Sequence, residues 1–471
     1  MLNNLHFANS IYNGYENYKQ QKLSSRRFKH SDILPLIEQL KNKEIFKLKK
    51  VGESIEKREV FLISIGSGSK KIFCWSQMHG DESTATAAIF DIINFFLAES
   101  HYADFKKHLL SNVTLYFLPM LNPDGAELFQ RRNLIEIDLN RDAKLKQSPE
   151  SKILTSVFNE IKPAFAFNLH DQDRIYSAGN NGKSATLSFL APAYDTEKSL
   201  NDGRSNSMKL IGRLYLILSE FIPGHIAKYQ DDFEPRAFGD TFAKSMTSVI
   251  LIESGGWHND REKLFIRKLN FISLLTSFKC IAEESYRDEL IETYFSIPEN
   301  EKLMMDFIIR KVTVVRDENE YILDIGINYE EINIDRNRNF YYQGKIDDIG
   351  DLSIYSGYKE LNAEGLTLEL GKTSDKEFKS FDELKDLNPF NLIGQGFTNV
   401  RLNSPDVNLT HSPFLFNIVA ENKERKESLK ETEIPNFVLK KDGIVKFAII
   451  NGFPIKLKNI SRHEGNALIL K

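Results

Sequence analysis

Between residues 59 and 256 the sequence alternates short apolar runs with longer segments of helical pattern. The runs are short enough to be buried strands. They lie at Glu59–Ile65, Ile72–Met78, Val113–Leu118, Ala164–Leu169 and Val249–Ile252. Ser83–Leu97 has the apolar spacing of a helix. Strands that alternate with helices predict an α/β fold in which a mixed, largely parallel sheet carries flanking helices.

After about residue 300 the pattern changes to that of β-hairpins. Lys311–Val315 and Tyr321–Ile327 form one candidate pair of strands, and Asp442-Gly443 is the tight-turn signal of another. No motif that carries chemistry is found in this part of the chain. We therefore expect three parts, namely an N-terminal helical extension (1–44), an α/β domain (45–298) and a β-rich C-terminal domain (299–471).

Composition and charge exclude several classes of protein. The 471 residues include 62 basic and 66 acidic side chains, and the net charge of −4 excludes a generally basic nucleic-acid-binding protein. A run of five basic residues from Lys19 to Lys29 is expected to be a solvated helix face. Cys74 and Cys280 lie in apolar runs, which predicts buried free thiols. The absence of a signal segment or spanning apolar stretch predicts a cytoplasmic protein without a membrane partner.

Side chains suited to metal binding or acid–base chemistry stand at the ends of three apolar runs. His79 directly follows the second run and Glu82 comes three residues later, while His170 ends the fourth run and Glu253 ends the fifth. Gly80 suits a tight turn that lets His79 and Glu82 point at one centre. Because ligands of open α/β sheets bind at the carboxyl ends of strands, these side chains are expected to converge. Two histidines and one carboxylate leave a fourth position open, as in catalytic zinc sites, and Glu253 is then free to be a general base.

Several short motifs resemble, in the same order and spacing, those of the M14 zinc carboxypeptidases. They are Gln77–Glu82 (His-x-x-Glu), Asn122–Gly125 (Asn-Pro-Asp-Gly), Arg131–Asn133 (Arg-x-Asn) and Asp138–Arg141 (Asp-Leu-Asn-Arg), followed by His170 and Glu253. The resemblance covers roughly residues 45–285. It implies the fold of that family, with residues 45–298 as a zinc carboxypeptidase-like catalytic domain.

The resemblance also implies a mechanism. One zinc ion per chain would be held by His79, Glu82 and His170. Glu253 would be the general base for the hydrolysis of a C-terminal peptide bond by zinc-activated water. The chain would then be a zinc-dependent metallocarboxypeptidase.

Four further residues have roles implied by the resemblance. Arg131 would stabilise the oxyanion that forms at the scissile carbonyl. Asn140 and Arg141 would bind the free carboxylate of the substrate, which suits a planar guanidinium group. Tyr229 would close over the substrate, since the family places a tyrosine shortly before its catalytic glutamate.

Two other functions remain open. The first is a zinc-dependent deacylase of N-acyl amino acids that uses the same site, so the substrate is a peptide or an acyl amino acid with a free carboxylate. The second is a non-catalytic binding protein of this fold, which is disfavoured because every chemical position is present. Asp142-Ala143 and Asp171-Gln172 depart from the family pattern, which usually has Asn-Phe and a serine at these places. These departures leave the metal ligands and the carboxylate-binding residues in place, but the resemblance does not extend to the side-chain specificity pocket.

Overall fold

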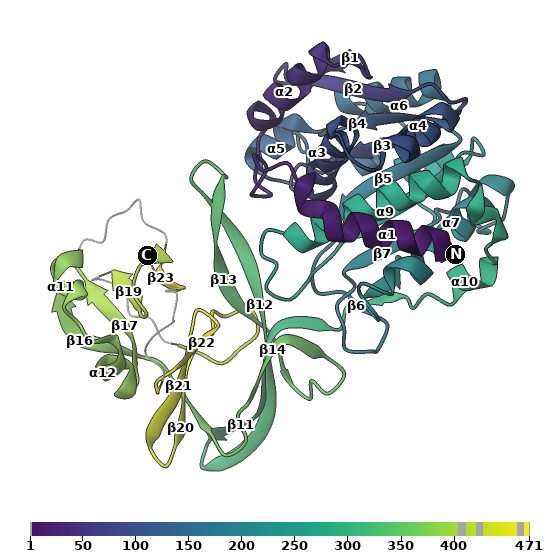
Figure 1. Ribbon diagram of the computed structural model, residues 1–471. Coiled ribbons are helices and arrows are strands. Elements are labelled where there is room, and N and C mark those ends of the chain that lie inside the picture. Colours follow the sequence, from purple (N-terminus) through teal and green to yellow (C-terminus); the bar gives the residue numbers. More distant parts are fainter. Residues whose placement is uncertain (1, 404–410, 421–426, 459–465, 471) are drawn as a thin grey trace. The chain divides into compact units, whose positions relative to one another are not determined.

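A computed structural model describes residues 2–403, 411–420, 427–458 and 466–470 of the chain. They form two compact units, Met1–Lys302 and Leu303–Lys471 (Figure 1). The first unit contains a sheet with helices, and the second is strand-rich. The predicted fold class, an α/β part followed by a β-rich part, is confirmed.

The first unit contains ten α-helices and ten strands among its described residues. The helices are α1 (Leu2–Gly14), α2 (His30–Glu38), α3 (Thr84–Leu97), α4 (Ala103–Asn112), α5 (Pro123–Leu128), α6 (Pro149–Ile161), α7 (Asp202–Leu218), α8 (Phe238–Ala243), α9 (Leu264–Ala282) and α10 (Ile291–Phe295). The strands are β1 (Phe46–Glu53), β2 (Glu59–Gly66), β3 (Lys70–Ser76), β4 (Val113–Leu118), β5 (Phe165–Asp171), β6 (Ser177–Ala178), β7 (Leu187–Leu190), β8 (Ile226–Lys228), β9 (Ser248–Ser254) and β10 (Asn300–Glu301).

Eight of these strands form one mixed sheet in the order β1-β2-β4-β3-β5-β9-β7-β8. The four central strands β4, β3, β5 and β9 are parallel to one another. All five predicted strands are present in this sheet, and the predicted bounds of β4 are those observed. The second predicted strand lies two residues earlier than expected, at Lys70–Ser76, and it ends at Ser76 because Gln77 has a left-handed backbone with φ of 51°.

Helices cover both faces of the sheet (Figure 1). One face packs against α3, α7 and α9 through a core that also includes α1 and α4. The opposite face packs against α6 and α8 around Trp75 and Phe158. Cys74 and Cys280 are free and buried in the first of these cores, as expected. None of the helices formed by the described residues has the length and apolar character needed to span a membrane.

A buried ion pair fastens the N-terminal segment to the first core. The guanidinium of Arg267 on α9 donates two hydrogen bonds to the carboxylate of Asp91 on α3, and both side chains are at most 2% exposed. The same carboxylate accepts hydrogen bonds from the Tyr15 hydroxyl, at 2.9 Å, and from the backbone N–H of Gln20, at 2.6 Å. Arg267 also donates to the backbone oxygens of Gln20 and Leu23. The pair therefore holds residues 15–23 against α3 and α9.

The expectation that the basic run is a solvated helix face is wrong, because the run lies outside the helices. Two of its members are also buried, since Arg27 and Lys29 are each only 2% exposed. Arg27 lies over the ring of Phe129, with 3.8 Å between the guanidinium carbon and the ring centre. Lys29 donates to the backbone oxygens of Ala126 and Glu127, at 3.0 and 2.6 Å. These basic side chains pair with the carboxyl end of α5, where free carbonyl groups favour a cation.

The second unit contains an eight-stranded and a five-stranded sheet among its described residues. The larger sheet has the order β13-β12-β11-β15-β20-β21-β22 with β14 beside β11, and the smaller has the order β16-β17-β19-β23-β18. Both predicted hairpins are present, as β11 with β12 and β20 with β21. The bounds are β11 (Met304–Arg316), β12 (Asn319–Ile334), β13 (Asn339–Gly350), β14 (Ser356–Asn362), β15 (Thr367–Leu370), β16 (Lys372–Phe378), α11 (Phe381–Lys385), α12 (Pro389–Gly394), β17 (Phe397–Leu402), β18 (His411–Ser412), β19 (Asn417–Ala420), β20 (Asn436–Lys441), β21 (Ile444–Ile450), β22 (Phe453–Lys456) and β23 (Ala467–Leu470).

The Asp91–Arg267 pair gives a test of the first core. Arg267→Met is expected to lower the free energy of unfolding by about 3–5 kcal/mol, because it leaves a buried carboxylate without its cation. Chemical denaturation measures this change. Lys49→Met is the matched control, since it breaks the Lys49–Glu160 pair in which both side chains are 56% exposed. Such exposed pairs contribute about 0–1 kcal/mol, so equal effects of the two substitutions would contradict the assigned role of Asp91–Arg267.

Candidate active site

Parallel pairing of three neighbouring strands brings the predicted site residues together. His170 in β5 is the direct register partner of Glu253 in β9, and β3, which precedes His79, pairs with the other side of β5. His79 and Glu82 lie in the turn between β3 and α3. A Cβ atom at Gly80 would lie 2.0 Å from the backbone of Gly125, so only glycine permits the close approach of this turn to α5.

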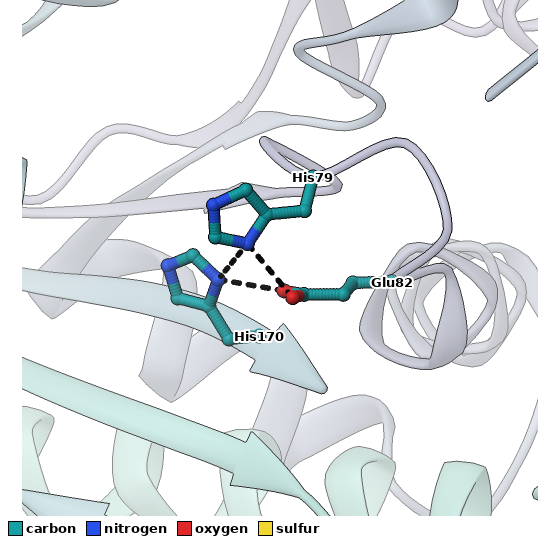
Figure 2. Close-up of side chains that lie close together, drawn as sticks. All are labelled: His79, Glu82 and His170. Carbon is teal, nitrogen blue, oxygen red and sulfur yellow. Dashed lines mark hydrogen bonds and ion pairs between the residues drawn. The ribbon is translucent and has the colours of Figure 1, made fainter. Parts of the chain in front are cut away.

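Figure 2 shows the side chains of His79, Glu82 and His170 pointing toward one another. Nδ1 of His79 lies 2.7 Å from Oε1 of Glu82, and Nδ1 of His170 lies 2.7 Å from Oε2 of the same carboxylate. The two Nδ1 atoms are 3.2 Å apart. All three residues are buried, and within the described ranges they are the one cluster of at least three such groups spaced for a metal ion.

This donor set fits a zinc ion. Two ring nitrogens bound at about 2.0–2.1 Å with a tetrahedral angle between them lie about 3.3 Å apart. The observed separation of the two Nδ1 atoms, 3.2 Å, agrees with that geometry. Two histidines with one carboxylate leave a fourth position open, which is the arrangement of catalytic zinc.

The charges in the cluster also suit a cation. Burial lowers the pKa of His79, but the charge of Glu82 and the hydrogen bonds that the ring donates to Asp138 and Glu82 outweigh it and raise that pKa to about 9. Burial raises the pKa of Glu82, but the two histidines hold it well below its ordinary range. Burial lowers the pKa of His170. At neutral pH His79 is therefore an imidazolium with a proton on each ring nitrogen, and a metal that binds Nδ1 must displace the proton there.

Asp138 is a site residue to which sequence reasoning gave no role. Its Oδ1 lies 3.1 Å from Nε2 of His79, the nitrogen that faces away from the cluster. Burial raises the pKa of Asp138, but the hydrogen bond to His79 and the charges of His79 and Arg131 hold it well below its ordinary range. A carboxylate on the far nitrogen of a ligand histidine fixes the ring and its tautomer. The signal was present, because Asp138 opens the Asp-Leu-Asn-Arg motif.

Arg131, the residue expected to stabilise the oxyanion, contacts the cluster. Its Nη1 lies 3.1 Å from Nδ1 of His79 and 3.3 Å from Oε1 of Glu82, while its Nε donates to Oδ2 of Asp138 at 3.1 Å. The side chain is 46% exposed, so the guanidinium lies between the buried cluster and solvent. A cation held at this place is suited to stabilise negative charge on a bound substrate.

Glu253 is a buried carboxylate without a cation of its own. In the described part of the chain no group donates a hydrogen bond to its side chain, and it forms no ion pair there. Burial, followed by the charge of Glu82, raises the pKa of Glu253 well above its ordinary range. A buried glutamate of raised pKa beside a metal-binding cluster has the character of a general acid or base.

The other three predicted residues have their described contacts outside this cluster. The side-chain oxygen of Asn140 accepts a hydrogen bond from the N–H of Phe238 at 3.1 Å. Nε of Arg141 lies 3.4 Å from Oε2 of Glu234, and the Arg141 side chain is 40% exposed. In the described ranges neither Asn140 nor Arg141 hydrogen-bonds to the cluster. Burial, followed by the charge of Glu253, raises the pKa of Tyr229.

Comparisons with known proteins agree with this geometry. Residues 33–176 match the zinc carboxypeptidase family (Peptidase_M14). The predicted resemblance is therefore confirmed for these residues. The chain is 32% identical over 113 residues to cytosolic carboxypeptidase 6 of Mus musculus, a match that covers 22% of this chain and 20% of that protein. It is 26% identical over 144 residues to carboxypeptidase SOL1 of Arabidopsis thaliana, covering 27% of this chain and 29% of the relative.

The segment similar to the zinc carboxypeptidases includes most but not all of the site. It contains the His-Glu-His cluster with Arg131, Asn140 and Arg141, whereas Tyr229 and Glu253 lie beyond it. The matches span less than a third of the length of these two relatives. Among solved structures, a metallo-carboxypeptidase from Pseudomonas aeruginosa covers 54% of this chain and 70% of its own, with a TM-score of 0.45 and 17% identity.

The contact between Asp138 and His79 gives a test of the cluster as a metal site. Asp138→Asn is expected to weaken zinc binding about 10- to 100-fold, which is the usual effect of losing a partner of a ligand histidine. Competition with a chromophoric chelator measures the zinc dissociation constant. Asp142→Asn is the matched control, because the Asp142 carboxylate binds the N–H groups of Gln147 and Ser148 instead. An Asp138→Asn dissociation constant within twofold of the control would contradict the role of Asp138.

Proposed function

We propose that this protein is a zinc-dependent metallocarboxypeptidase that hydrolyses the C-terminal bond of peptides. The observation that carries the proposal is the buried convergence of His79, Glu82 and His170 beside Glu253. The match of residues 33–176 to the zinc carboxypeptidases supports it. A zinc ion bound there supplies a Lewis acid that polarises a carbonyl group and makes water more acidic.

In this proposal the chain's own residues position the substrate and move the proton. Arg141 and the side-chain amide nitrogen of Asn140 bind the terminal carboxylate of the substrate. The guanidinium of Arg131 stabilises the oxyanion that forms at the scissile carbonyl. Glu253 takes a proton from the attacking water and donates it to the leaving amine. Tyr229, near Glu253, covers the bound substrate.

Arg141 tests the proposal that the substrate needs a free carboxylate. Arg141→Ala is expected to lower kcat/KM about 10- to 150-fold on a free peptide, since a hydrogen bond to a charged group contributes about 1.5–3 kcal/mol. Steady-state kinetics with one peptide in free and C-terminally amidated forms measure this. Arg132→Ala is the matched control, because the Arg132 side chain donates to the backbone oxygen of Glu136 at the surface.

The wild-type protein is expected to leave the amidated peptide intact. Equal turnover of the two peptides would contradict the carboxypeptidase proposal. The same assay with N-acyl amino acids in place of peptides tests the deacylase alternative, which predicts faster turnover of the small substrates.

Glu253 tests the proposed base. Glu253→Gln keeps the shape of the side chain but removes the proton acceptor, so kcat is expected to fall about 10²- to 10⁴-fold while zinc content is unchanged. Metal analysis and kinetics of the purified variant measure both quantities. Near-normal turnover would mean that the base lies elsewhere, and loss of zinc would make Glu253 a metal ligand.

A further inference from the structure

One lysine joins the ends of the two strands that carry His170 and Glu253. Nζ of Lys263 lies 2.9 Å from the backbone oxygen of Ser254, the residue after Glu253. It also lies 3.3 Å from Oδ2 of Asp171, the residue after His170. A single ammonium group therefore bridges β5 and β9 immediately beyond the candidate metal ligand and the candidate base.

Asp171 extends this bridge to Glu82, the third residue of the cluster. Its backbone N–H donates to Oε2 of Glu82 at 3.2 Å, and its Oδ2 accepts from the hydroxyl of Thr84 at 2.6 Å. The Asp171 side chain is 7% exposed and that of Lys263 is 16% exposed. Within the described ranges Lys263 is the cation paired with this carboxylate, whose Oδ1 is buried without a hydrogen-bond partner.

The backbone of Lys263 is strained. Its φ of 51° lies in the left-handed region, which a residue with a side chain occupies at a cost. The start of α9 does not depend on the lysine side chain, because Oδ2 of Asp260 accepts the N–H groups of Phe265 and Ile266 at 3.0 and 3.2 Å. In this left-handed conformation the Lys263 side chain reaches the ends of both β5 and β9.

We propose that Lys263 is a positioning residue that fixes the ends of β5 and β9, and thereby the relative placement of His170 and Glu253. The inference rests on the proposed function, since it concerns the ligand set and the base of that site. Lys263 acts through Asp171 and Ser254, to which it is bonded directly. Asp171 stands where the zinc carboxypeptidases commonly have serine, so this bridge uses a position at which the sequence departs from the family pattern.

The test removes the bridge without leaving an unpaired buried charge. Lys263→Met alone would leave the buried Asp171 carboxylate without its cation, which would destabilise the folded protein. The double variant Lys263→Met/Asp171→Asn keeps the net charge and the backbone N–H that binds Glu82. Lys279→Met/Glu283→Gln is the matched control, because it neutralises an ion pair at the opposite end of α9 in which the lysine is only 6% exposed.

The double variant is expected to raise the zinc dissociation constant about 10- to 100-fold, measured by chelator competition. Its kcat per zinc-bound chain is expected to fall by a similar factor, with KM within about threefold of wild type. The control should remain within about threefold of wild type in all three quantities. The single variant Lys263→Arg should retain most of the zinc affinity and kcat of the wild type, because a guanidinium also donates to two oxygen acceptors.

The outcomes separate this inference from the proposed function. Zinc affinity and kcat within about threefold of wild type in the double variant would overturn the role of Lys263, and so would an equal loss in the control. A wild-type protein that binds zinc but hydrolyses no peptide would contradict the proposed function alone, and the zinc affinities would still decide the role of Lys263. A wild-type protein that binds no zinc would overturn both.

Discussion

The parallel pairing of β5 with β9 is the constraint on which the candidate site depends. It places His170 and Glu253 side by side, and the pairing of β3 with β5 brings the turn that contains His79 and Glu82 to the same edge of the sheet. Each of these strands is buried on both faces, so a shift of register would cost much apolar contact as well as the site. The same packing that stabilises the sheet therefore fixes the distances between donors.

The turn after β3 and helix α5 depend on each other, which gives a physical reason for two of the sequence motifs to occur together. The backbone N–H of Asn122 donates to the carbonyl of Gln77 at 3.0 Å, and Gly80 lies against Gly125 too closely for any side chain. The side chain of Asn122 in turn accepts the N–H of Gly125 at 2.9 Å. The Asn-Pro-Asp-Gly motif thus acts as a support for the turn that carries His79 and Glu82.

The sequence predicted the central strands because their burial leaves continuous apolar runs, as in Val113–Leu118, whose bounds match β4. It predicted the cluster because His79, Glu82 and His170 follow such runs. It did not predict the contacts of Asp138 and Lys263 with the site, because neither residue ends an apolar run and local patterns report only near neighbours. Asp138 is 59 residues from His79, and Lys263 is 92 residues from Asp171. The buried state of Lys29 likewise depends on carbonyl groups of α5 almost one hundred residues away.

The charges around the site link metal binding to the state of Glu253. Without a metal, the positive charges of His79 and Arg131 lie against the negative charges of Glu82 and Asp138, and burial raises the pKa of Glu253, which favours its neutral form. A divalent cation that displaces the proton of His79 adds one net positive charge. That charge lies beside a buried carboxylate with no other partner in the described ranges, so it favours ionisation of Glu253. The cluster and the candidate base are therefore coupled through the low-dielectric interior, and Glu253 gains the capacity to accept a proton when a cation occupies the neighbouring cluster.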